Sequence, residues 1–256
     1  MGWEEWSQRK MKSELLLPKI FDKLEKFYGK PKTPKSILRS LTGRADPYEM
    51  IVYTTCGYPA SDTACAKGFE ALKKEVGIRP ADILGAPEKK LVEILRLGGI
   101  VPELRAQRLR EIAARVKHEF GGNLSEVLER PLLEVRKALK SFPTIGDSGV
   151  DKILLFTRTA PIAAVPSNCP EVTVRLMRGQ PYKNYGVNYR EAQGAVRAGV
   201  PADCTALLRA YLLLKHHGQE ICKRTRPLCD QCPVARGCAY FRSRRHAGGR
   251  EDARNE

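Results

Sequence analysis

The sequence predicts an all-α protein, and three observations carry that prediction. Apolar residues recur three or four positions apart in many successive segments, which is the spacing of a buried helix face. No stretch longer than a few residues alternates between apolar and polar side chains as a half-buried strand does. Glycines separate the helical segments, for example at Gly77, Gly98-Gly99 and Gly121-Gly122. With 256 residues the chain is long enough for one large or two small domains with a buried core.

The first predicted helix covers 14–28, with Pro18 near its start and Gly29 after its end. Its apolar residues lie three or four apart among Lys and Glu residues. A basic linker, 30–35, follows, and Asp46 then caps a second helix. The later helices are predicted at 62–76, 88–97, 103–119, 131–142, 149–158, 170–178, 188–198 and 203–217.

The charge balance points to a polyanionic partner. Lys and Arg number 45 against 29 Asp and Glu, a net charge of +16. In a protein of ordinary apolar content this excess favours nucleic acid first, and a generally basic surface is the alternative. No apolar run approaches the roughly 20 residues that span a bilayer, and no apolar signal segment opens the chain. We therefore expect a protein without membrane association, located in the cytoplasm and associated with the nucleoid in a prokaryote. We also expect a monomer.

Four of the eight cysteines lie within seventeen residues, at Cys222, Cys229, Cys232 and Cys238, spaced C-x6-C-x2-C-x5-C. Short loops between thiolates allow four sulfurs to converge on one metal ion or iron–sulfur cluster. A pair of disulfides is the alternative, which a reducing cytoplasm disfavours. The spacing alone leaves zinc and iron–sulfur open, although only Cys229 and Cys232 form the knuckle that structural zinc sites usually have twice. His216 and His217, just before the loop, are expected to cap and pack rather than to bind the metal.

A second motif lies at 139–158, where two helical segments flank the tight turn Phe142-Pro143-Thr144-Ile145-Gly146. Backbone N–H groups at a turn that enters a helix N-terminus bind phosphate without reading the base. An ordinary corner between two helices is the alternative.

Together, these two motifs resemble the endonuclease III family of helix-hairpin-helix DNA glycosylases, and Pro233 after the third cysteine fits the family's loop. The resemblance covers roughly 12–241. It implies a structural [4Fe–4S] cluster bound by Cys222, Cys229, Cys232 and Cys238. It also implies two helical domains with double-stranded DNA in the groove between them. The expected domains are 46–164, which contains the hairpin at 139–158, and 12–45 plus 165–241, which contains the cluster; 242–256 is a predicted disordered tail.

The resemblance further implies the residues that contact DNA. From the hairpin these are Thr144, Ile145, Gly146 and Ser148, and from the cysteine loop Lys223, Arg224 and Arg226. Thr144 stands where the family has the first glycine of its hairpin. The family often has a glutamine that fills the gap left by a flipped base, and Pro59 replaces it here. Tyr58 or Pro59 can still wedge between bases.

The two catalytic positions of the family are also changed. Two residues after the last glycine of the hairpin, lyases of the family carry a lysine that forms a Schiff base, and this chain has Ser148. A family aspartate aligns with Pro166, in a register fixed by Ser167-Asn168 and by Val172 to Leu176. Neither a hydroxyl nor a proline ring supplies the missing chemistry.

Three hypotheses follow for the function. The first is a DNA-binding protein on the glycosylase scaffold, without lyase or glycosylase activity, that recognises damaged or distorted DNA. The second is a monofunctional glycosylase with a displaced carboxylate from Asp147, Asp151 or Asp62, and Lys152 is the fallback amine. Asp147 and Asp151 are otherwise expected to cap the second helix of the hairpin. The third is a regulator whose DNA affinity follows the redox state of the cluster.

Overall fold

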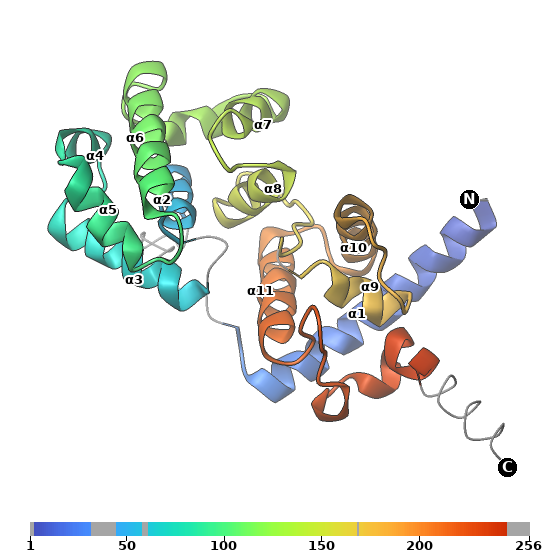
Figure 1. The fold of residues 1–256 in the computed structure, drawn as a ribbon. Coiled ribbons are helices and arrows are strands. Elements are labelled where there is room, and N and C mark those ends of the chain that lie inside the picture. Colours follow the sequence, from blue (N-terminus) through green and yellow to red (C-terminus); the bar gives the residue numbers. More distant parts are fainter. Residues whose placement is uncertain (1–2, 32–44, 58–60, 168, 245–256) are drawn as a thin grey trace, which may run out of the picture. The chain divides into compact units, whose positions relative to one another are not determined.

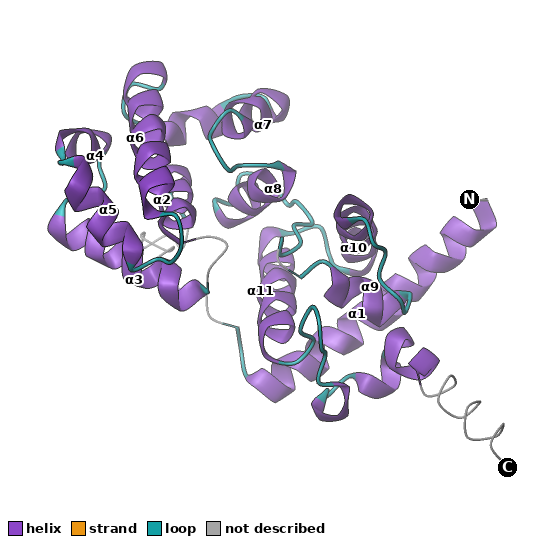
Figure 2. Ribbon diagram, viewed as in Figure 1, coloured by secondary structure: helices purple, strands orange, loops and turns teal. Residues whose placement is uncertain are grey.

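The computed structural model describes residues 3–31, 45–57, 61–167 and 169–244, with side chains from Leu16 onward. Every regular element within these ranges is a helix, as the ribbon in Figure 2 shows. This confirms the all-α class. The chain divides into two compact units, 33–159 and the pair 1–32 with 160–256, and each is described by itself (Figure 1).

The unit of residues 33–159 is built around one buried helix. Its elements are α2 (Pro47–Gly57), α3 (Asp62–Glu75), α4 (Pro80–Gly85), α5 (Glu88–Arg96), α6 (Pro102–Glu119), the 3-10 helix η1 (Leu124–Glu129), α7 (Leu132–Lys140) and α8 (Asp147–Phe156). α2 packs against α3, α6 and η1, and nearly all of its residues are buried. Asp46 caps α2, because its Oδ1 accepts a 2.8 Å hydrogen bond from the backbone N–H of Glu49. The predicted cap is confirmed.

The second unit combines the two ends of the chain. It contains α1 (Trp3–Tyr28), α9 (Glu171–Met177), α10 (Tyr185–Gly199), α11 (Cys204–Glu220) and two short 3-10 helices, η2 (Cys229–Gln231) and η3 (Ala235–Gly237). α1 packs against α10 and α11, and both of these helices also contact α9. The contact face of α1 is apolar and fully buried, with Leu17, Ile20, Phe21 and Leu24. Arg209 of α11 adds ion pairs to Asp22 and Glu25 of α1.

Two α-helices differ from the prediction, and the short 3-10 helices were not predicted. α1 begins at Trp3 rather than at residue 14, so Pro18 lies in the interior of a helix of 26 residues. The predicted start was wrong. Proline removes one intrahelical hydrogen bond and its ring crowds the preceding turn, but α1 continues through Pro18, which lies on the exposed side. α4 was not predicted, because six residues are too few to show a helical period. No helix in the described part of the chain is long and apolar enough to cross a membrane.

Candidate functional site

The hairpin turn between α7 and α8 is anchored by its apolar residues. Phe142 and Ile145 are buried, and the backbone N–H of Ile145 donates a 3.2 Å hydrogen bond to the carbonyl oxygen of Phe142. Thr144 and Gly146, between and after them, are exposed. The apolar residues therefore anchor the turn, and Thr144 and Gly146 remain exposed to solvent.

Thr144 has a left-handed backbone conformation, with φ of 69°. Glycine adopts the left-handed region without steric strain, whereas other residues lose about 1 kcal/mol or more of folding free energy there. The position is the one where the family hairpin has its first glycine. A residue other than glycine therefore holds a strained backbone conformation in this turn.

The start of α8 presents unpaired donors. Gly146 is the N-cap and has no side chain to satisfy the first N–H groups, and the first intrahelical bond runs from Val150 N to Gly146 O at 3.0 Å. The N–H groups of the preceding three residues have no intrahelical acceptor, and the positive end of the helix dipole lies there. Ser148 lies in this first turn and is half-buried. The arrangement can bind an anion.

The acidic residues of the hairpin already have basic partners. Asp151 is almost fully buried, and its Oδ1 lies 2.8 Å from Nη1 of Arg136. Asp147 is exposed and pairs with Nζ of Lys140, also at 2.8 Å. These two carboxylates therefore contribute to the structure of the hairpin. Lys152, the fallback amine, is half-buried with its Nζ 5.8 Å from the ring centre of Phe156.

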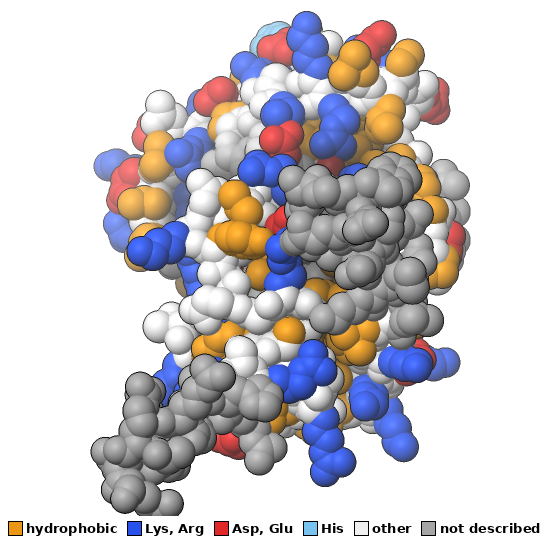
Figure 3. Space-filling view, turned by 90° about the vertical axis from the view of Figure 1, so that its right-hand side faces the viewer, with side chains coloured by type: hydrophobic (Ala, Val, Ile, Leu, Met, Phe, Trp, Pro, Cys, Tyr) orange, Lys and Arg blue, Asp and Glu red, His pale blue; other side chains and the backbone are white. Residues whose placement is uncertain are grey.

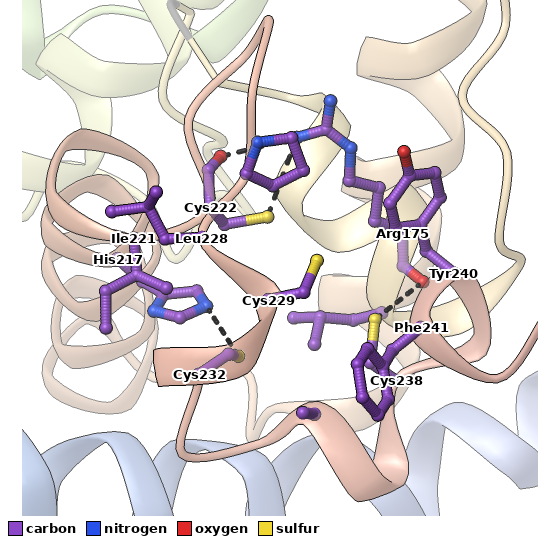
Figure 4. A pocket seen from close by; sticks show the side chains of 13 residues that line it. Arg175, His217, Ile221, Cys222, Leu228, Cys229, Cys232, Cys238, Tyr240 and Phe241 are labelled. Carbon is purple, nitrogen blue, oxygen red and sulfur yellow. Dashed lines mark hydrogen bonds between the residues drawn. The ribbon is translucent and has the colours of Figure 1, made fainter. Parts of the chain in front are cut away.

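The cysteine loop, residues 222–238, follows α11 in the same unit. The N–H groups of Ile221 and Cys222 both donate to the carbonyl oxygen of His217, at 3.0 and 2.7 Å, and so close the helix. Four cysteines line one cavity beyond this end, together with apolar side chains such as those of Leu228 and Phe241 (Figure 4). They are the four predicted ligands Cys222, Cys229, Cys232 and Cys238.

Arg175 of α9 fixes the first part of this loop. Its guanidinium is buried and donates to the carbonyl oxygens of Lys223 at 2.9 Å and Arg224 at 2.6 Å. Nη1 also lies 3.6 Å from Sγ of Cys222. The guanidinium carbon lies 5.3 Å from the ring centre of Tyr240, beyond the last cysteine. One side chain therefore connects both ends of the loop to α9 (Figure 4).

The three basic residues of the loop have exposed side chains, as a phosphate contact requires. Lys223 and Arg226 form no ion pair within the described part of the chain, whereas Nε of Arg224 lies 3.5 Å from Oε1 of Glu171 in α9. Glu171 is buried. This pair holds the Arg224 side chain toward α9, an arrangement that was not predicted.

Burial governs the ionisation of the thiols. It raises the pKa of Cys232 to about 11, and it also raises the pKa of Cys222, which the hydrogen bond from Arg175 lowers in part. Without a bound cation these groups are therefore thiols at neutral pH, and metal binding would release their protons. The donor set of four cysteines in one cavity fits an iron–sulfur cluster. No three His, Cys, Asp or Glu side chains of the described ranges are grouped so that they could hold a metal ion. The fit to a cluster therefore rests on the donor set and on the cavity that the four cysteines share, and not on a preformed metal geometry.

His217 lies beside the cavity as well. Its ring is fully buried, with Nε2 3.6 Å from Sγ of Cys232 and Nδ1 2.9 Å from the hydroxyl oxygen of Tyr28. Burial, and to a lesser degree the neighbouring His216, lower the pKa of His217 to about 4, so that the ring is neutral. The predicted packing role is confirmed by this burial, but the contact with a cysteine is an addition to it.

Pro166, which stands at the family's aspartate position, and the candidate carboxylate Asp62 belong to other segments of the chain. Pro166 is buried in the irregular segment before α9, and its carbonyl oxygen accepts a 3.1 Å hydrogen bond from Cys169 N. Asp62 begins α3, and its carbonyl oxygen accepts a hydrogen bond from the hydroxyl of Tyr53. Tyr58, Pro59 and Asn168 lie outside the described residues.

Sequence reasoning gave no role to Arg175, Glu171 or Tyr28. Arg175 and Glu171 belong to the segment that fixed the register of Pro166, which was the only signal available for them. Tyr28 is 189 positions from His217, and no local pattern relates the two.

Comparison with known proteins finds similarity to endonuclease III and to thymine-DNA glycosylases. The chain is 23% identical to endonuclease III of Thermotoga maritima over 213 residues, which cover 82% of this chain and 89% of the relative. It is 24% identical to a thymine-DNA glycosylase of Aeropyrum pernix over 197 residues, which cover 77% and 84%. The chain matches no protein-family model.

Solved structures agree on the fold. A non-covalent endonuclease III–DNA complex superposes with a TM-score of 0.69 at 17% identity, covering 91% of this chain and 98% of that one. A thermostable thymine-DNA glycosylase gives 0.64 at 18% identity, covering 93% and 98%.

The chain is therefore similar in sequence to endonuclease III and to a thymine-DNA glycosylase, and it shares its all-helical fold with solved structures of such proteins.

Proposed function

We propose that this protein binds damaged or distorted double-stranded DNA as a monomer and has no base-excision chemistry. The observation that carries the proposal is the pair of residues at the family's catalytic positions, Ser148 in the first turn of α8 and the buried Pro166. Schiff-base formation with the sugar needs an amine, and a serine hydroxyl cannot form an imine. Stabilising an oxocarbenium-like charge needs a carboxylate, and proline has none.

Binding of DNA rests on charge and on the hairpin. The net charge is +16, and Lys and Arg side chains project at many points of the face drawn in Figure 3. The open N–H groups at the start of α8 and the exposed Lys223 and Arg226 are suited to phosphate. Two of the structural relatives are endonuclease III–DNA complexes. In the expected division of the chain, 46–164 contains the hairpin, and 12–45 plus 165–241 contains the cysteine loop.

The cysteine loop is proposed to hold a [4Fe–4S] cluster, which the thiolates of Cys222, Cys229, Cys232 and Cys238 would bind. When bound, the cluster would supply a rigid core that keeps the loop in shape. Arg175 already holds the backbone of Lys223 and Arg224, so the basic side chains would project from a fixed backbone. The cluster has no part in excision in this proposal.

The alternative is a monofunctional glycosylase with a displaced carboxylate. The relatives named as thymine-DNA and thymine/uracil-DNA glycosylases make this the chemistry to exclude. Asp151 is a poor acid or base for it, because it is buried against Arg136. Asp147 is the better candidate, because it is exposed in the same helical turn as Ser148 and only pairs with Lys140 at the surface.

The experiment is a base-release assay with protein in excess over duplexes that carry uracil, thymine mismatched with guanine, an oxidised pyrimidine or an alkylated purine. Binding of the same duplexes and of an undamaged duplex is measured in parallel. The proposal expects tighter binding of at least one damaged or mismatched duplex and no base release. Release that disappears in Asp147→Asn would establish the alternative, and equal affinity for all duplexes would contradict damage recognition.

A further inference from the structure

Three side chains form a continuous hydrogen-bonded chain that ends at one of the cysteines. The Tyr28 hydroxyl of α1 lies 2.9 Å from Nδ1 of His217 in α11, and Nε2 of the same ring lies 3.6 Å from Sγ of Cys232. The last of these contacts is drawn in Figure 4. The three residues come from the start, the last helix and the terminal loop of the unit that holds 1–32 and 160–256.

The contacts are held in place by packing. His217 has no exposed surface, and Tyr28 is half-buried, so bulk water has little access to the imidazole. The ring of His216 meets the ring of Tyr28 edge to face, with centres 4.5 Å apart. The backbone of His217 is fixed too, because its carbonyl oxygen closes α11. The ring therefore keeps one orientation toward Cys232.

The direction of the hydrogen bonds follows from the chemistry of the last group. A neutral imidazole has one N–H donor and one acceptor nitrogen. A thiolate that binds iron can only accept, so Nε2 of His217 must carry the proton and Nδ1 must accept. The hydroxyl of Tyr28 must then be the donor. With a free thiol at Cys232 the opposite direction is equally possible, because S–H can donate to Nε2.

We propose that His217 is a hydrogen-bond donor to the Cys232 thiolate of the cluster and that Tyr28 is the positioning residue that holds His217 in this tautomer. The inference rests on the cluster of the proposed function. Hydrogen bonds to ligand sulfurs tune the reduction potential of iron–sulfur clusters. A donor stabilises the more negatively charged, reduced state, so it raises the potential and protects the cluster against oxidation.

The test compares purified full-length variants for iron content, visible absorbance and midpoint potential. His217→Leu removes the donor and Tyr28→Phe removes only the hydroxyl that fixes the tautomer. His217→Gln replaces the imidazole by an amide that can still donate. Tyr48→Phe is the matched control, because Tyr48 is a buried phenol of the other unit whose hydroxyl has no partner among the described residues.

We expect iron in the unmodified protein and a midpoint potential that falls most in His217→Leu, less in Tyr28→Phe and least in His217→Gln. The rate of cluster loss under mild oxidant should rise in the same order, and Tyr48→Phe should match the unmodified protein. If iron is bound but Tyr28→Phe and His217→Leu shift the potential no more than Tyr48→Phe does, the donor role is wrong and the cluster stands. If no iron is bound, the cluster proposal fails and this inference fails with it.

Discussion

Nη1 of Arg175 donates a 2.9 Å hydrogen bond to the carbonyl oxygen of Lys223, and this contact ties the cysteine loop to α9. Nη2 makes the adjacent bond to the carbonyl oxygen of Arg224 at 2.6 Å. Because the buried Arg175 donates to two consecutive carbonyl oxygens, it fixes the backbone that carries the basic side chains of the loop.

Arg175→Ala should destabilise the protein by at least about 2 kcal/mol, because it leaves part-buried carbonyl groups without a donor. It should also reduce the iron content and expose the loop to limited proteolysis. Arg178→Ala is the control from the end of the same helix, where the side chain pairs with Glu191 near the surface. That change should cost less than about 1 kcal/mol. If the two substitutions lowered the free energy of denaturant unfolding equally, the proposed structural role of Arg175 would be contradicted.

Lys223→Ala and Arg226→Ala should weaken binding to all duplexes alike. Each change removes one exposed cation of the loop, so the slope of log affinity against log salt should become smaller by about 1. Lys73→Ala, an exposed lysine of α3, is the control and should leave the slope unchanged if α3 lies outside the interface. Fluorescence anisotropy at four salt concentrations measures all three. An unchanged slope in both loop variants would argue against the loop as a phosphate contact.

Thr144→Gly should leave the stability unchanged or raise it by up to about 1 kcal/mol. Glycine adopts a φ of 69° without strain, which stabilises the folded state. It also raises the conformational entropy of the unfolded chain, which cancels part of this stabilisation. Thr63→Gly is the matched control, because Thr63 is exposed in the first turn of α3. There the same change should destabilise by about 0.3 kcal/mol, which is the difference between the helix propensities of threonine and glycine. A larger loss at Thr144 than at Thr63 in denaturant unfolding would contradict the strained turn.

Asp151→Asn should destabilise the protein by about 3 kcal/mol, near the lower end for breaking a buried ion pair, because Arg136 can still reach solvent. Asp147→Asn breaks only the exposed pair with Lys140 and should cost less than about 1 kcal/mol. Thermal unfolding of both variants tests the structural assignment. If Asp151→Asn kept full stability while abolishing a base-release activity, Asp151 would be the displaced carboxylate.

Most of the fold follows from local patterns. The apolar spacing located the helices of both units within a few residues, and Asp46 is the cap that its position before Pro47 predicted. The start of α1 did not follow, because residues before 14 show no apolar period and Pro18 suggested a boundary. α4 is too short for any period.

The site was predictable where its residues are close in sequence and not where they meet only in the fold. The cysteines and the hairpin are contiguous motifs, so their spacing revealed them. The contacts of Arg175 with Lys223, and of Tyr28 with His217, join residues 48 and 189 positions apart. Such pairs are set by how helices pack, which one sequence does not reveal. The left-handed conformation of Thr144 could not be predicted either, because threonine gives no sequence signal for a positive φ.

The measurement that tests the central claim most directly is borohydride trapping on DNA with an abasic site. The unmodified protein should form no covalent complex above background, because Ser148 offers no amine to the sugar. Ser148→Lys with Pro166→Asp should give weak trapping, limited by geometry, since a displacement of about 1 Å can cost about 100-fold in rate. Efficient trapping by the unmodified protein would contradict the account, and loss of that trapping in Lys152→Ala would identify Lys152 as the amine.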